Sequence, residues 1–147
     1  MTRPALRRRR RNEERGTATA FVVGFAVVLL ACAGLVIDGG TALNARMKLA
    51  DDVEQAARAG AQEIDVAYLR ESDQVRLNPS AAQARAGGYL AGIGYSNFNA
   101  QVVPDVNGAP NSVQVAARDT VPTTMLKMIG ISSFDIEASA TAQAVTQ

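Results

Sequence analysis

Few side chains in this sequence have the chemistry of a catalytic or metal-binding site. The 147 residues include no histidine, and the one cysteine, Cys32, lies within an apolar run. Metal sites built from imidazole or thiolate ligands are therefore excluded, as are Ser-His and Cys-His nucleophile pairs. We accordingly predict no enzymatic activity, no metal or other cofactor, and no small-molecule substrate.

The carboxylates that cluster most closely are Asp51, Asp52 and Glu54. They occur in a stretch with helical periodicity, and Glu54 stands four residues before Arg58, the spacing of an ion pair on one helix face. A solvated helix face explains this pattern better than acid/base catalysis does. The glycines of Gly87–Gly92 lack both the lysine and the strand-loop-helix context of a phosphate-binding loop.

Charge is divided unevenly along the chain. Residues 1–15 contain seven arginines and two glutamates, whereas the chain from Asp38 onward has eight basic and twelve acidic residues. An arginine run can bind nucleic acid. Beside an apolar span, however, it is better explained as a topogenic signal that also meets anionic headgroups. We therefore predict membrane lipid as a partner and no nucleic acid.

Between these two parts, residues 16–37 form a run of 22 residues without a charge. At 1.5 Å per residue, about 20 helical residues cross the roughly 30 Å hydrocarbon layer. Positively charged flanks stay on the cytoplasmic side of a membrane. We predict a single-pass protein of the bacterial cytoplasmic membrane with a cytoplasmic N-terminus and an extracytoplasmic C-terminal part. Asp38 is then expected in the outer interface.

Two cleaved forms compete with this uncleaved span. Leu29–Cys32 fits a loose lipobox that ends in a lipidated cysteine, and Ala31–Ala33 fits a small-x-small signal-peptidase site. Against both, the apolar run continues to Ile37, whereas a mature N-terminus usually turns polar at once. A cleaved secreted or lipidated protein is kept as an alternative to the anchor.

Beyond the span, small and apolar residues recur at three- and four-residue steps, with charged residues between them. This predicts that the helix continues as an amphipathic stalk over residues 38–70. Four small residues are singled out as a packing stripe: Ala50, Ala57, Gly60 and Ala61. The stripe can pack against another copy of the helix or against the chain's own sheet, and both remain open.

Residues 71–147 are predicted to form a small α+β head. Pro79 opens a second short helix, where proline occupies its permitted first turn. Asn107-Gly108 favours a turn between two strands, and a short apolar helical segment is expected at 123–130. Three segments alternate as strands do: 101–103, 112–117 and 134–145. The predicted fold class is α+β: one transmembrane helix extended as an amphipathic helix, followed by a small antiparallel β-sheet head.

The order of these features resembles a known family. Arg15-Gly16, the uncharged run, GLVIDGG at Gly34–Gly40 and LADDVEQAARAGAQEID at Leu49–Asp65 are similar to the TadE/TadG-like proteins of the tight-adherence (Flp) pilus system. Residues 121–144 resemble the end of those domains. The family motif at the membrane exit comprises Asp38, Gly39 and Gly40.

The resemblance implies a membrane-anchored minor pilin or pseudopilin, a structural component of Flp pilus assembly or of a related type II secretion apparatus, without enzymatic activity. It implies as partners other components of that apparatus and copies of the chain itself. The alternative from another class is an unrelated single-span membrane protein with an extracytoplasmic binding domain.

One position departs from the pilin pattern. Prepilins are cut after a glycine that follows basic residues, which the resemblance places between Gly16 and Thr17. They typically carry glutamate five positions beyond that glycine, where this sequence has Phe21. A glutamate is costly in lipid and so serves as a specific pairing element in a filament. Its absence favours the TadG-like branch, which can remain in the membrane, and leaves cleavage and filament entry open.

Overall fold

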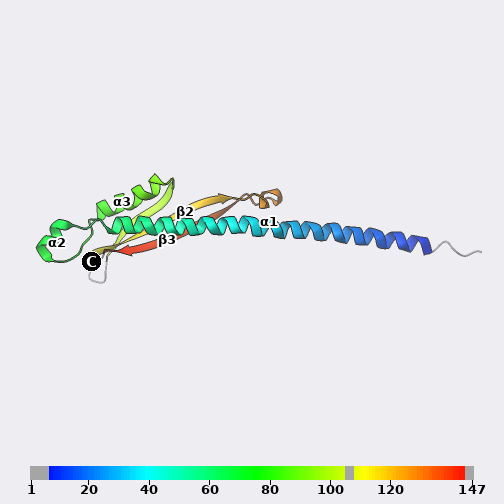
Figure 1. Cartoon of the computed structure of the whole chain (residues 1–147), viewed down its shortest axis with the longest axis horizontal. Coiled ribbons are helices and arrows are strands. Elements are labelled where there is room, and N and C mark those ends of the chain that lie inside the picture. Colours follow the sequence, from blue (N-terminus) through cyan, green and yellow to red (C-terminus); the bar gives the residue numbers. More distant parts are fainter. Residues whose placement is uncertain (1–6, 105–107, 145–147) are drawn as a thin grey trace, which may run out of the picture. The chain divides into compact units, whose positions relative to one another are not determined.

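The computed structural model describes residues 7–104 and 108–144, with side chains from residue 16 onward. The side chains of the arginine-rich segment 1–15 therefore lie outside the described residues, as does Asn107 of the predicted turn. The elements in chain order are helices α1 (Arg7–Ala61), α2 (Val66–Ser72) and α3 (Pro79–Gly92), strands β1 (Asn97–Pro104) and β2 (Pro110–Pro122), the 3-10 helix η1 (Leu126–Ile129) and strand β3 (Ser133–Gln143) (Figure 1).

The chain divides into two compact units. The first contains the residues up to Gly40 together with Thr123–Ser132, the connection between β2 and β3. The second contains Thr41–Pro122 and the chain from Ser133 onward. Helix α1 contributes to both units, and its helical hydrogen bonding continues through Gly39 and Gly40.

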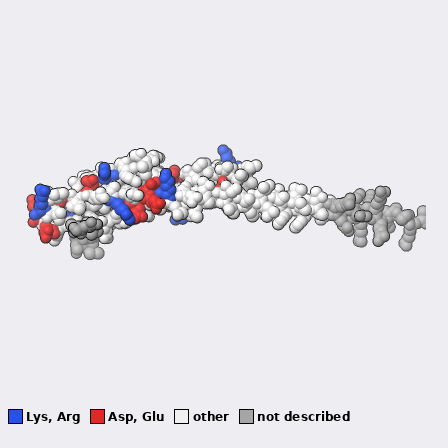
Figure 2. Space-filling model, viewed as in Figure 1, with Lys and Arg blue, Asp and Glu red and all other residues white. Residues whose placement is uncertain are grey.

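In the first unit, helix α1 is long and apolar enough to span a membrane. Between residues 16 and 37 only Gly34 is buried, and large apolar side chains such as Leu30 and Val36 are more than 70% exposed. The described part of this run presents a surface without lysine, arginine, aspartate or glutamate (Figure 2). The sequence-based prediction of one long apolar helix is thus confirmed.

The second unit contains a three-stranded antiparallel sheet in the order β1-β2-β3. The register sets Val115 of the central strand opposite Ala100 on one side and Ala140 on the other. Burial alternates along β3 as its sequence predicted, since Ile136 is buried and both of its neighbours are exposed. The fold class is α+β, a long N-terminal apolar helix followed by a small antiparallel sheet, which confirms the prediction.

The core of this unit lies between the sheet, α3 and the C-terminal part of α1. Its fully buried members include Leu49, Val53, Ala57, Ala82, Ala86, Leu90, Val113 and Val115. Many of them are small, which lets the backbones approach closely. A Cβ added at Gly60 would lie 2.9 Å from the carbonyl oxygen of Ala82 and 3.2 Å from the Cβ of Ala86. The absence of a side chain at Gly60 therefore sets how near α1 and α3 come.

Helix α1 ends at Ala61, short of the stalk that periodicity predicted. Beyond it, Ile64 forms an isolated bridge with Leu77, which takes the backbone out of the helix. Asp65 then caps the separate helix α2 and accepts a hydrogen bond from Arg76 Nη2 at 2.6 Å. This hydrogen bond holds the pKa of Asp65 below its ordinary value.

Helix α3 begins at Pro79, as predicted, and Asn78 caps it by accepting the Ala81 N–H at 3.3 Å. After the helix, the Tyr95 hydroxyl donates to Asp52 Oδ2 at 2.9 Å and so ties the turn before β1 to helix α1. Burial, reinforced by this hydrogen bond to a carboxylate, raises the pKa of Tyr95 to about 12.

Replacing Gly60 by alanine is expected to lower the free energy of unfolding by about 1–3 kcal/mol, because the added methyl group overpacks the contact with Ala82. Gly88→Ala is the matched control, since nothing lies within 4 Å of a Cβ there. That control is expected to stabilise α3 by about 0.5–1 kcal/mol. Amide hydrogen exchange of the full chain in detergent measures both, and equal protection in the two variants would contradict the packing.

Stability of the second unit is expected to fall as the pH rises from about 10 to about 12. A phenol whose pKa is raised by folding contributes stability that is complete below its unfolded value and is lost as pH passes the folded value. The loss is roughly 1 kcal/mol after discounting for solvent screening. Tyr95→Phe removes this titration, so its stability curve should be flatter in that window. Identical slopes for both proteins would refute the assignment.

Candidate functional site

Gly34 and Asp38 stand one turn apart on helix α1, and both are buried. Asp38 is only 3% exposed although it ends the apolar run. The sequence led us to expect this carboxylate in the outer interface of the membrane. In the structure it is covered by the Thr123–Ser132 connection, which belongs to the same compact unit.

Three consecutive backbone N–H groups donate to the Asp38 carboxylate. The nitrogen of Thr124 lies 2.9 Å from Oδ1, and those of Met125 and Leu126 lie 2.9 Å and 2.6 Å from Oδ2. Hydrogen bonds to an ionised acceptor are among the strongest in proteins. The Leu126 amide, followed by those of Thr124 and Met125, holds the pKa of Asp38 below its ordinary value, while burial acts in the opposite direction.

Gly34 makes room for this connection. A Cβ at Gly34 would lie 3.0 Å from the Cβ of Met125, closer than side chains ordinarily approach. Residues four apart lie on the same face of a helix. Gly34 therefore leaves space for the connection on the same face where Asp38, one turn later, binds the amides of the connection. The spacing within GLVIDGG thus has a structural explanation.

The connection is also held by bonds of its own. The Thr123 N–H donates to the Ser132 carbonyl at 3.0 Å, and the Thr123 hydroxyl donates to the Ile131 carbonyl. The short helix expected at 123–130 is present as the 3-10 helix η1, after which Gly130 adopts a φ of 95° and reverses the chain. Leu126 points inward and is 4% exposed.

The remaining members of the membrane-exit motif and the processing site lie at the surface of α1. Gly39 is half-buried and Gly40 is exposed, so the buried contact of the motif is carried by Asp38. Gly16 and Thr17 are both exposed. Cleavage between them stays a prediction.

The stripe of small residues is divided between core and surface. Ala57, Gly60 and Ala61 are buried within the chain's own second unit, whereas Ala50 is exposed. The stripe residues are thus engaged mainly in internal packing, one of the two arrangements left open by the sequence. A contact of these residues with another copy stays a prediction.

Asp52 and Glu54, two of the clustered carboxylates of α1, have structural partners. Glu54 forms an ion pair with Arg58, and both side chains are more than half exposed. Asp52 accepts the Tyr95 hydroxyl. Among the residues that the structure describes, no three His, Cys, Asp or Glu side chains come together in a way that could hold a metal ion.

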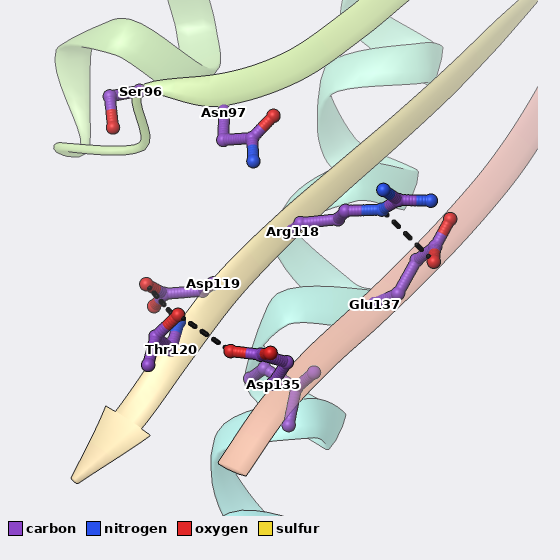
Figure 3. A pocket seen from close by; sticks show the side chains of 8 residues that line it. Ser96, Asn97, Arg118, Asp119, Thr120, Asp135 and Glu137 are labelled. Atoms are coloured by element: carbon purple, nitrogen blue, oxygen red, sulfur yellow. Dashed lines mark hydrogen bonds and ion pairs between the residues drawn. The ribbon is translucent and has the colours of Figure 1, made fainter. Parts of the chain in front are cut away.

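Charged groups also gather at a hollow on the polar face of the sheet (Figure 3). Arg118 Nε lies 3.1 Å from Glu137 Oε2, and the Thr120 hydroxyl donates to Asp135 Oδ1 at 2.9 Å. The side chains of the ion pair are 66% and 56% exposed. These are cross-strand pairs between neighbouring strands, solvated and satisfied by each other, and they do not assemble an activated nucleophile or base.

Sequence reasoning missed the partners of Asp38, the amides of Thr124, Met125 and Leu126. The available signals were an aspartate directly after an uncharged run, a glycine four residues before it, and an isolated apolar segment far downstream. None of these signals indicates that the end of the uncharged run contacts the downstream apolar segment.

Replacing Asp38 by alanine is expected to release the connection, because three N–H groups then lose their acceptor. Hydrogen-exchange protection of the Thr124, Met125 and Leu126 amides should fall by roughly tenfold or more in the full chain in detergent. Asp51→Ala, an exposed position of the same helix, is the control and should leave these amides protected. Unchanged protection in Asp38→Ala would show that the carboxylate does not hold the loop.

Comparison with known proteins bears on the segment that contains this site. No match was found among curated proteins or among solved structures. Residues 16–63 match the model of the family described as "Putative Flp pilus-assembly TadE/G-like". The matched segment includes the apolar run, Gly34, Asp38 and the buried end of α1. The resemblance to the TadE/TadG-like proteins is therefore confirmed over residues 16–63, and this part of the chain is similar to the Flp pilus-assembly TadE/G-like family.

Proposed function

We propose that this protein is a membrane-anchored structural component of Flp pilus assembly or of a related type II secretion apparatus, in the manner of a minor pilin or pseudopilin. The observation that carries the proposal is the apolar segment of α1, which matches the pilus-assembly family and has almost no protein cover in the described residues. Such a surface requires lipid or the helices of neighbouring subunits around it.

The dimensions of the segment support a membrane span. Residues 16–37 form about 33 Å of helix at 1.5 Å per residue, close to the roughly 30 Å of the hydrocarbon layer. The arginines of residues 1–15 would remain on the cytoplasmic side. The rest of the chain is then extracytoplasmic.

The proposed role is structural and involves no catalysis. The charged groups that meet in the second unit form ion pairs or hydrogen bonds with each other, as Arg118 does with Glu137 and Tyr95 with Asp52. These contacts stabilise a small head on an anchor. Contact with other subunits would come from the apolar segment, where Phe21 replaces the pairing glutamate of pilins.

Deleting the gene in its native bacterium is expected to abolish or sharply reduce surface filaments seen by electron microscopy, with recovery on complementation. Val28→Arg should fail to complement, because arginine near the middle of the span costs about 2.5–3.5 kcal/mol on insertion. Val28→Leu is the matched control and should complement. Both substitutions concern the same side chain, which is 56% exposed and outside the core.

Normal filaments in the deletion strain would contradict the assembly role, and membrane fractionation then separates the alternatives. A chain that stays in the membrane as its full-length form indicates a single-span protein with a binding domain. Release of Cys32→Ala, but not of the native chain, indicates a lipidated protein.

A further inference from the structure

The Thr123–Ser132 connection carries an apolar surface that no other described residue covers. Met128 is 86% exposed and Ile129 is 62% exposed, while Met125 and Ile131 are each about 45% exposed. A connection between two strands is ordinarily polar because it faces water. The exposed apolar side chains of this connection therefore require an apolar environment in place of water.

The depth of the connection along α1 indicates what that environment is. Met125 packs beside Gly34, which lies one turn inside the apolar run from Asp38. Four residues of helix amount to about 6 Å. The connection therefore overlaps the last turn of the segment proposed to span the membrane, and its exposed side chains continue that segment's apolar surface.

The backbone of the connection is suited to a medium poor in water. Polar main-chain groups at membrane depth must find partners within the protein. The N–H groups of Thr124, Met125 and Leu126 bond to Asp38. Others bond within the connection, as Thr123 does to Ser132 and Ile131 does to the Leu126 carbonyl.

The charge of the connection also fits a lipid surface. Lys127 is the one charged residue between 123 and 132, and it is exposed. A lysine next to large apolar side chains can reach headgroup phosphates while its neighbours enter the acyl boundary. The negative charge of Asp38 is met by three amides and is not presented to the lipid.

We propose that the Thr123–Ser132 connection is a second membrane contact, with Met128 and Ile129 inserted into the headgroup and upper acyl region of the extracytoplasmic leaflet. Asp38 and Gly34 hold it against the spanning helix at that depth. This inference rests on the proposed membrane anchoring of α1 and adds a second element that meets the lipid.

The chain has no tryptophan, so a single substitution introduces a clean fluorescent reporter of lipid contact. Three full-length variants would be reconstituted in vesicles of phosphatidylethanolamine and phosphatidylglycerol with doxyl-labelled lipids. Met128→Trp tests the connection, Phe25→Trp tests the middle of the span, and Thr141→Trp reports background on the solvent-facing side of the sheet. All three positions are exposed, so the fold should tolerate the change.

Shallow doxyl labels are expected to quench Met128→Trp about twofold or more above the Thr141→Trp background, with deep labels less effective, because interfacial insertion reaches only the upper acyl region. Phe25→Trp should show the opposite depth preference. Adding Asp38→Ala to Met128→Trp should reduce the quenching, since the connection is then released.

Three results would overturn the proposal. If the tryptophan of Met128→Trp emits at the wavelength of a water-exposed indole and is not quenched by doxyl lipids, the connection faces solvent. Blue-shifted emission that doxyl lipids do not quench, and that reverts on dilution with lipid, would assign the surface to a second copy of the chain. Absence of quenching in Phe25→Trp would remove the membrane span itself, and with it the proposed function, whereas failure of Met128→Trp alone removes only this inference.

Discussion

The hydrogen bonds between the Asp38 carboxylate and three successive amides are the constraint on which the first unit depends. A carboxylate 3% exposed is tolerated only when donors replace the water it has lost. The amides of Thr124, Met125 and Leu126 have the reciprocal need, because they open the η1 turn and have no helical acceptors of their own. The carboxylate and the three N–H groups satisfy one another, and these bonds join the apolar helix to a loop far along the chain.

The second constraint is the close approach of neighbouring chain segments, which a glycine permits in each of the two units. At Gly34 the missing side chain admits Met125, and at Gly60 it admits the backbone of Ala82. The chain has no tryptophan and few other aromatic residues, so large side chains fill little of its interior. Its packing relies on short distances between small residues, which retains dispersion contacts that bulkier side chains would otherwise provide.

Periodicity predicted the parts of this fold that are local. The uncharged run predicted the long helix, alternation predicted β3, and Pro79 predicted the start of α3. The partners of Asp38 were not predictable, because the bonded residues are 86 to 88 positions away and no periodic signal records such a pairing. The end of α1 was missed for a similar reason, since the bridge from Ile64 to Leu77 overrides a helical pattern that continues in sequence.

The division of the small-residue stripe narrows how the chain can meet other subunits. Because Ala57, Gly60 and Ala61 are enclosed by the second unit, they are not available to another copy unless that unit opens. Within the apolar segment 16–37, only Gly34 is buried in the described structure. If the proposed assembly role holds, contacts between subunits therefore concentrate in the membrane plane. At the position where a glutamate would supply a charge, Phe21 supplies an apolar side chain. Association of the helix with other subunits would therefore depend on the packing of apolar side chains, which can fit more than one partner helix.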